Sequence, residues 1–104
     1  MFGLGGIYVE VMKDVSFRAL PLSIRETRLM VKEIKSYPLL LGVRGEPPKD
    51  IDKIVDTIFR IGFILQNCPQ ITDIEVNPLM VYNKGAKAVD VRVMLSDNKD
   101  ISDE

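Results

Sequence analysis

The 104-residue sequence contains no histidine, no tryptophan and only one cysteine, Cys68. A single cysteine cannot form an internal disulfide, and without histidine its thiol has no imidazole base for nucleophilic catalysis. We therefore interpret Cys68 as a small buried hydrophobic residue in a protein of the reducing cytoplasm.

The sequence also lacks an excess of charge of either sign and long apolar runs. Its 14 Lys and Arg residues nearly balance 15 Asp and Glu residues, which leaves a net charge of −1. No basic run is interleaved with aromatic residues, so nucleic-acid binding is disfavoured. No apolar stretch approaches the roughly 20 residues of a membrane-spanning helix, and residues 1–10 do not resemble a signal peptide. We expect one cytoplasmic domain at most, with neither a membrane nor a nucleic acid as partner.

A first helix is predicted in the middle of the chain. Ser23 and Glu26 have the spacing of a capping box, in which each side chain accepts a backbone N–H at the helix start. The helix should run from about residue 24 to residue 35, where Tyr37-Pro38 stops it. Its inward side chains should be Ile24, Val31 and Ile34.

A second, longer helix should begin after Asp50, which can cap it, and end at residues 67–69. Its apolar positions follow helical spacing and are Ile51, Ile54, Val55, Ile58, Gly62 and Leu65. Phe59 and Phe63 widen this stripe, which predicts a helix covered on two sides.

Alternating residues near the end of the chain predict a hairpin. With Lys84-Gly85 at its tip, Leu79 would lie opposite Asp90, and Asn77 opposite Arg92. One face of the first strand should then carry Glu75, Asn77, Leu79 and Val81, and the other Ile74, Val76, Met80 and Tyr82. In the return strand Ala88, Asp90, Arg92 and Met94 should alternate with Val89, Val91, Val93 and Leu95.

The polar side chains of this hairpin allow two interpretations. Hard oxygen donors such as those of Glu75, Asn77 and Asp90 suit Mg²⁺, which commonly bridges protein carboxylates to nucleotide phosphates, and Arg92 could bind a phosphoryl group. From composition alone, the same residues are the solvated face of a half-covered antiparallel sheet.

Four segments in the same order resemble one family. They are residues 2–11 (FGLGGIYVEV), 13–18 (KDVSFR), 42–48 (GVRGEPP, with Asp50 after it) and 75–79 (EVNPL), the last followed by Asp90-Val91-Arg92. These segments resemble the ATP-grasp domain of NDP-forming acyl-CoA synthetases, as in the β subunit of ADP-forming acetate–CoA ligase, and more distantly the succinyl-CoA synthetase β subunit. The resemblance extends from Met1 to about Leu95.

The resemblance implies site residues and a reaction. Asn77 and Asp90 would be Mg²⁺ ligands with Glu75 beside them, and Arg92 would contact the phosphates of ATP or ADP. The family interconverts acyl-CoA, ADP and phosphate with free acid, ATP and CoA. The acyl substrate and the choice between ADP and GDP stay open.

By the same resemblance, residues 1–95 correspond to the C-terminal half of the ATP-grasp domain. The implied partners are therefore the N-terminal ATP-grasp lobe and a CoA-binding subunit or domain, and the chain alone should be inactive. The alternative is a non-catalytic half-domain that serves as an interaction module for a partner subunit.

The glycine-rich start also allows two interpretations. Gly5 and Gly6 could let backbone N–H groups approach a phosphate, and Glu10 could point into the same cleft. The loop fits neither the dinucleotide fingerprint nor a Walker A motif, and we favour a glycine-rich bend before a strand over residues 7–11. For Glu10 we favour a solvated strand carboxylate.

Together these patterns predict an α+β fold with a mostly antiparallel sheet backed by the two helices. The expected strands cover residues 7–11, 15–20, 71–76, 79–83 and 88–95. The acidic residues 96–104 should form a disordered tail.

Overall fold

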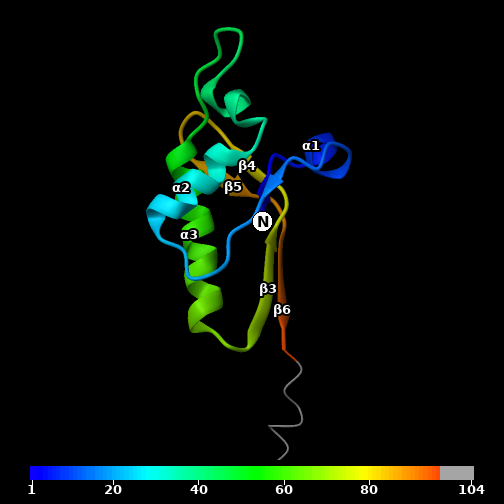
Figure 1. Cartoon of the computed structure of the whole chain (residues 1–104), viewed down its shortest axis with the longest axis vertical. Coiled ribbons are helices and arrows are strands. Elements are labelled where there is room, and N and C mark those ends of the chain that lie inside the picture. The colour runs from blue at the N-terminus through cyan, green and yellow to red at the C-terminus, as the bar shows by residue number, and fades with distance from the viewer. Residues whose placement is uncertain (97–104) are drawn as a thin grey trace, which may run out of the picture.

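A computed structural model describes residues 1–96 and shows the expected α+β fold (Figure 1). In chain order its elements are β1 (Phe2–Gly3), α1 (Gly6–Glu10), β2 (Val15–Ser16), α2 (Ile24–Glu33), the 3₁₀ helix η1 (Tyr37–Leu41), α3 (Ile51–Asn67), β3 (Ile71–Val76), β4 (Leu79–Val81), β5 (Ala86–Ala88) and β6 (Val91–Leu95). The strands form three antiparallel pairs, β1–β2, β3–β6 and β4–β5. Within the predicted tail, Ser96 donates its backbone N–H to the Gln70 carbonyl at 2.7 Å, and residues 97–104 lie outside the described residues.

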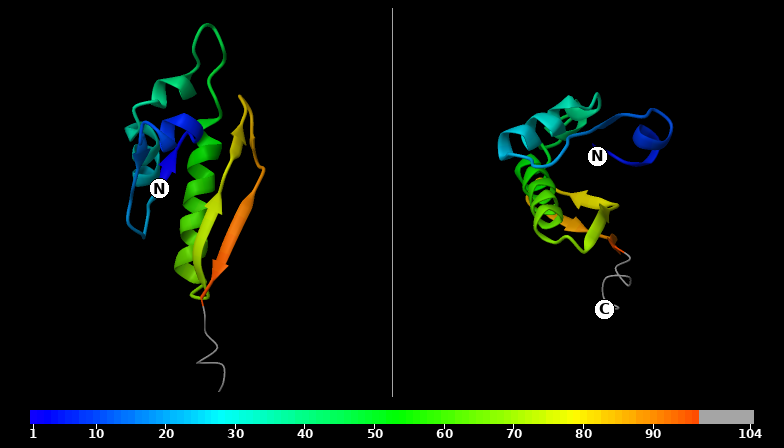
Figure 2. Two further views of the ribbon diagram at one scale, coloured as in Figure 1. Left: turned by 90° about the vertical axis from the view of Figure 1, so that its right-hand side faces the viewer. Right: turned by 60° about the horizontal axis from the view of Figure 1, so that its bottom comes forward.

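Helix α3 forms the middle layer, between α2 on one side and the hairpin on the other (Figure 2). The buried core is a cluster of Val31, Leu40, Ile54 and Val55, in which α2, η1 and α3 meet. Side chains from the start of the chain and from the hairpin pack against this cluster, including Phe2 and Val81. Within residues 1–96, no helix has both the length and the apolar character needed to cross a membrane.

The two predicted helices are present, with caps at the expected residues. Ser23 Oγ accepts the Glu26 N–H at 3.0 Å, and Asp50 Oδ1 accepts the Lys53 N–H at 3.1 Å. The Glu26 carboxylate does not close the predicted capping box, because it forms an ion pair with Arg18 at 3.0 Å. Sequence-local signals therefore located both helix starts correctly.

One prediction about inward helix faces is wrong, and another holds only in part. Ile24 is 53% exposed although it lies seven residues before the buried Val31 on the same helix face, because the buried residues of α2 begin only at Thr27. The prediction that α3 is covered on two sides is confirmed, because α3 lies between α2 and the hairpin, but Phe63 itself is 62% exposed. At Ile24 on α2 and at Phe63 on α3, the apolar stripe of the helix extends beyond the residues that are buried.

The N-terminal prediction is also wrong, because residues 6–10 form helix α1 and not a strand. Gly5 and Gly6 have φ angles of 81° and 53°, in the left-handed region that glycine adopts without a Cβ penalty, and they turn the chain into the helix. Ile7 and Val11 stay exposed, so no neighbouring sheet stabilises an extended conformation there. The second predicted strand is reduced to β2, which pairs with β1.

The Asp14 carboxylate is a buried clamp on the end of α2. Its two oxygens accept the backbone N–H groups of Lys35 and Ser36 at 2.7 and 2.8 Å. The neighbouring Ser36 side chain and these two N–H groups outweigh the effect of burial and hold the pKa of Asp14 below its ordinary value. The Ser36 hydroxyl lies beside the carboxylate without a hydrogen bond of good geometry.

The Asp50 carboxylate joins α3 to the tip of the hairpin. One oxygen caps α3, and the other accepts the Gly85 N–H at 2.6 Å, while the Asp50 N–H donates to the Tyr82 carbonyl at 2.7 Å. The Gly85 and Lys53 N–H groups lower the pKa of Asp50. This one residue therefore ties the tip of the hairpin to the start of α3.

We predict that acid destabilises the fold. Because the pKa values of Asp14 and Asp50 are lowered in the folded state, their stabilising effect is complete above about pH 4 and is lost as pH falls further. Urea unfolding between about pH 7 and pH 2.5 should show a falling midpoint below about pH 4. An unchanged midpoint over this range would show that the ionised carboxylates of Asp14 and Asp50 do not stabilise the fold.

A second prediction separates the two contacts of Asp50. Asp50→Asn keeps an oxygen to cap α3 but presents an amide N–H to the Gly85 N–H, whereas Asp50→Ala removes both acceptors. The melting temperature should fall in both variants, by about 5–10 °C for Asp50→Ala and by less for Asp50→Asn. Circular dichroism melts measure this, with Asp52→Ala, which removes only an exposed ion pair with Arg28 at 2.9 Å, as a nearby acidic control. Equal melting temperatures for Asp50→Ala and Asp52→Ala would refute the stabilising role of the Asp50 carboxylate.

Candidate functional site

The candidate site lies on the long hairpin formed by β3, β4, β5 and β6. In the strand register Glu75 lies opposite Arg92 and Leu79 opposite Ala88, and the Tyr82 N–H donates to the Gly85 carbonyl at 3.0 Å across the turn. The Asn77 N–H donates to the Asp90 carbonyl at 3.0 Å, so these two residues face each other. The predicted register, with Asn77 opposite Arg92 and Leu79 opposite Asp90, is therefore wrong by two residues, because the turn is centred on Asn83-Lys84 and not on Lys84-Gly85.

The two-residue error leaves the polar residues on the predicted face. Side chains alternate with a period of two, so only an odd shift would move them to the opposite face. Glu75, Asn77, Asp90 and Arg92 accordingly line one hollow of about 210 Å³, and all four residues are exposed. The alternation of side chains along the two strands, which the sequence predicted, therefore brings these four side chains to one face.

Beyond Pro78 the predicted alternation is wrong. Leu79 and Val81 are half buried, and Val81 packs against the core, whereas Met80 is 45% and Tyr82 48% exposed. Two hydrogen bonds of 3.0 Å lie where β3 gives way to β4. One runs from the Asn77 N–H to the Asp90 carbonyl and the other from the Val89 N–H to the Pro78 carbonyl, so they join consecutive residue pairs. In a regular ladder such bonds join every second pair, so the alternation changes phase here. The peptide bond between Asn77 and Pro78 is cis.

The four side chains of the hollow make no ion pair with one another. Within residues 1–96 the salt bridges of up to 4.0 Å involve Arg18, Arg28 and Arg60, and none joins Arg92 to Glu75 or Asp90. Two carboxylates, one amide and one guanidinium therefore face the same space and are not tied to each other. This arrangement leaves their oxygen and nitrogen atoms available to a ligand.

The donor chemistry of the hollow fits Mg²⁺ with phosphate. Mg²⁺ is usually held by one or two carboxylates together with phosphate oxygens and waters, and it does not need a complete protein cage. Glu75 and Asp90 supply two carboxylates and Asn77 an amide oxygen. No cluster of three or more Asp, Glu, Cys or His side chains suited to a metal occurs in the described part of the chain, so phosphate and water would have to complete the shell.

The glycine loop is not part of this hollow. Gly5 and Gly6 have open space around them and lead into α1, and Glu10 is exposed at the end of that helix. None of the three lines the hollow on the hairpin. The loop also does not precede the predicted strand but opens the short helix α1.

Sequence reasoning did not foresee the second role of Asp50. The capping pattern predicted its contact with α3, but its bond to Gly85 joins residues 35 positions apart. Such a pair has no local sequence signal. Arg18, the last residue of the segment 13–18, pairs with Glu26 at 3.0 Å and with Glu33 at 2.6 Å, which is a structural role.

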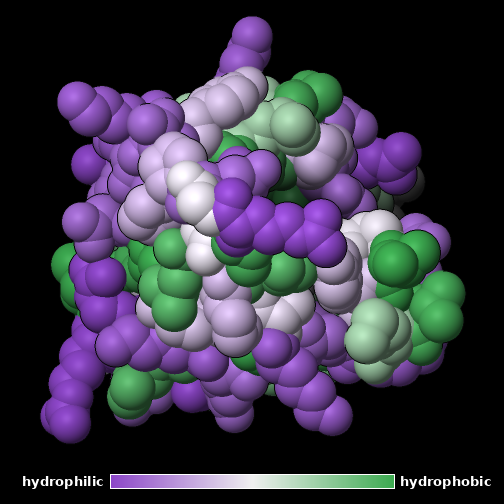
Figure 3. Space-filling model, turned by 90° about the horizontal axis from the view of Figure 1, so that it is seen from above, coloured by the Kyte–Doolittle hydropathy of each residue, from purple (hydrophilic) through white to green (hydrophobic). Residues whose placement is uncertain are grey.

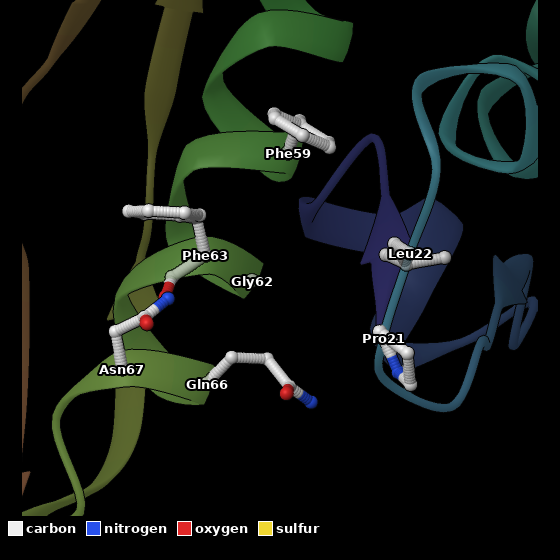
Figure 4. Close-up of a pocket in the computed structure, with 7 residues that line it drawn as sticks. All are labelled: Pro21, Leu22, Phe59, Gly62, Phe63, Gln66 and Asn67. Carbon is white, nitrogen blue, oxygen red and sulfur yellow. The ribbon is translucent and has the colours of Figure 1, made fainter.

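A second hollow, of about 230 Å³, lies between α3 and the segment before α2 (Figure 4). It is lined by Pro21, Leu22, Phe59, Gly62, Phe63, Gln66 and Asn67. These residues carry no formal charge, so this hollow has no group suited to neutralising a metal ion or a phosphate.

Comparison with known proteins places residues 1–95 in the family described as the ATP-grasp domain. The chain is 46% identical over 95 residues to the β subunit of the ADP-forming acetate–CoA ligase I of Pyrococcus furiosus, covering 91% of the chain and 41% of that relative. It is 42% identical over 97 residues to the ADP-forming 4-hydroxybutyrate–CoA ligase of Nitrosopumilus maritimus, covering 91% of the chain and 14% of that relative. These alignments span less than half of either relative.

A solved structure shows the same fold. It is the dinucleotide forming acetyl-coenzyme A synthetase 1 of Candidatus Korarchaeum cryptofilum, in complex with coenzyme A, Ca-AMPCP and HgCl⁺. The TM-score is 0.85 at 46% sequence identity, over 90% of this chain and 41% of that one.

We predict that the polar face of the hairpin contributes little to stability. The side chains of Asn77 and Asp90 are exposed, so Asn77→Ala and Asp90→Ala should each shift the melting temperature by no more than about 3 °C. Val31→Ala, at a residue that is 0% exposed, should lower it by about 10 °C or more. Thermal unfolding in either hairpin variant as severe as in Val31→Ala would show that these side chains support the fold.

Proposed function

We infer the function of this chain from its family, because the chain belongs to the ATP-grasp domain family over residues 1–95. We propose that the hairpin face of Glu75, Asn77, Asp90 and Arg92 binds the phosphates of ATP or ADP together with Mg²⁺. In this proposal the chain is the nucleotide-binding part of an ADP-forming acyl-CoA synthetase.

The observation that carries the proposal is the composition of the hollow. Four side chains from the two strands of the hairpin face one open space, and all of them are polar. Asn77 and Asp90 lie directly opposite each other, so their oxygens can share one cation, with Glu75 beside them. The chemistry that Mg²⁺ supplies when bound is neutralisation of phosphate charge.

Arg92 has a separate role in the proposal. A guanidinium can donate paired hydrogen bonds to phosphate oxygens and keeps its charge at any physiological pH. Because Arg92 makes no ion pair within residues 1–96, it can take up phosphate without first breaking a protein contact. Together the face would hold the charged end of the nucleotide and stabilise charge that develops during phosphoryl transfer.

The proposed reaction is that of the whole assembly. It interconverts acyl-CoA, ADP and phosphate with free acid, ATP and CoA, in the cytoplasm. The relatives are ADP-forming ligases of acetate and 4-hydroxybutyrate, and the solved relative was obtained with coenzyme A and a nucleotide analogue, which supports this class of reaction. The proposed partners are an N-terminal ATP-grasp lobe and a CoA-binding subunit or domain.

The hollow alone offers too few contacts for tight nucleotide binding. It is open, and its four side chains address only phosphate and metal. Contacts to the base and ribose would have to come from the N-terminal lobe, and without them the phosphates are not held in position for transfer. We therefore propose that the chain by itself is inactive.

We predict that Mg·ATP binds tightly only when the N-terminal lobe is present. Isothermal titration of Mg·ATP into the full chain should give a Kd weaker than about 1 mM, and addition of an N-terminal ATP-grasp lobe should bring it to the micromolar range. In the reconstituted pair, Asn77→Ala and Asp90→Ala should each weaken binding at least about tenfold. Lys87→Ala, an exposed substitution on β5 outside the hollow, is the matched control.

Two outcomes would contradict this proposal. Micromolar binding of Mg·ATP by the chain alone would refute the need for a second lobe. Tight association with the lobe, combined with nucleotide binding that Asn77→Ala and Asp90→Ala do not affect, would favour the alternative of a non-catalytic interaction module.

A further inference from the structure

The outer edge of β6 is an unpaired strand edge. In the part of the chain that the structure describes, β6 pairs only with β3, in a sheet of two strands. Figure 2 shows β6 on the side of β3 that faces away from α3. All five residues of β6 are exposed, among them Val91 at 49%, Val93 at 48% and Leu95 at 68%.

The ladder determines which backbone groups point outward from this edge. Asn77 donates to Asp90, and Glu75 pairs with Arg92 two residues further along. Because backbone groups along a strand point alternately to its two sides, Arg92 and Met94 face β3. The N–H and C=O groups of Val91, Val93 and Leu95 therefore face the free edge.

We propose that this edge pairs with β6 of a second copy of the chain, antiparallel and with the two-fold axis at Val93. Such pairing places Val93 opposite Val93 and Val91 opposite Leu95, so the outward backbone groups meet each other. A two-fold contact of this kind is closed, since the same edge serves both copies. The association adds to the proposed function and does not depend on it.

Side chains favour this register over its neighbours. On one face it joins the apolar residues Val91, Val93 and Leu95 of both copies, and on the other it places Arg92 opposite Met94. A register centred on Arg92 would bring two guanidinium groups directly opposite each other, which is unfavourable. A register centred on Met94 would overlap only three residues of each strand. The Val93 register is the one that pairs all five residues of β6 without opposing like charges.

The edge also lacks the usual protection against such pairing. Exposed edges are commonly blocked by proline, by charged side chains or by a bulge. The β6 sequence VRVML contains no proline, and its one charged side chain, Arg92, lies on the polar face of the hairpin. The bulge in this sheet lies in β3, between Ile71 and Asp73. The apolar face of β6 is likewise open, because α3 packs on β3.

The size of the contact sets its strength. Five paired residues per copy form a much smaller interface than the roughly 1,600 Å² of a standard complex, so the dimer should be weak and should depend on concentration. The two polar faces would lie on the same side of the resulting four-stranded sheet, and the hollow of each copy would stay open. Strand edge and polar face are thus separate surfaces of the same hairpin.

The test combines analytical ultracentrifugation with charge variants of the full chain. From about 10 µM to about 1 mM, the wild-type chain should shift from monomer toward dimer. Val93→Lys and Val93→Glu should each weaken association at least about tenfold, because two like charges then oppose each other at the axis. An equimolar mixture of the two variants should restore it to within about threefold of wild type. Val11→Lys, at an exposed valine of the α1 segment, is the matched control and should associate as wild type does.

Hydrogen exchange provides an independent measurement on the unmodified chain. Raising its concentration should slow exchange at the amides of Val91, Val93 and Leu95 and leave those of Arg92 and Met94 unchanged. A chain that stays monomeric over the whole range overturns the proposal. Association that Val93→Lys weakens no more than Val11→Lys does, or that the mixture fails to restore, overturns it as well. So does an edge that becomes protected only when an N-terminal lobe is added.

Discussion

The structure depends on one carboxylate, that of Asp50, which holds the hairpin against the helical core. Its two oxygens bind the first turn of α3 and the Gly85 N–H, at 3.1 and 2.6 Å. The hairpin otherwise meets the helices through β3 and through Val81, while β6 is exposed along its whole length. A long two-stranded ribbon is marginal on its own, so a fixed point at its tip is needed to give it one orientation.

Stability and the candidate site are in different parts of the molecule. The buried residues belong to α2, η1 and α3, and the polar hollow lies on the exposed hairpin. Helix α1 also lies outside the buried core and leaves apolar side chains exposed, and Figure 3 shows apolar surface on that side of the molecule. Few packing contacts depend on the positions of Arg92 and of the Glu75 and Asp90 carboxylates. Arg92 can therefore lie beside these carboxylates without forming an ion pair with either. An arrangement of this kind suits a ligand that brings both a cation and phosphate.

The hairpin offers two surfaces that do not compete. The face formed by Glu75, Asn77, Asp90 and Arg92 is proposed to bind Mg²⁺ and nucleotide phosphate, and the edge formed by Val91, Val93 and Leu95 to pair with a second copy. Residues alternate between these surfaces along β6, because successive side chains and successive backbone groups point in opposite directions. Either surface can therefore be altered without removing the other.

The sequence by itself determined the helix starts, the hairpin and the set of side chains on its polar face. Ser23 and Asp50 cap helices through contacts three residues away, and alternation brought Glu75 and Asn77 to the face of Asp90 and Arg92 even though the predicted register was two residues off. Only the tertiary structure decided that residues 6–10 are helical, that alternation changes phase at Pro78 and that Asp50 also binds Gly85. Caps and alternation act over a few residues and are visible in the sequence. Whether an apolar segment finds a strand to pair with, and which distant amide meets a carboxylate, depends on where the rest of the chain lies.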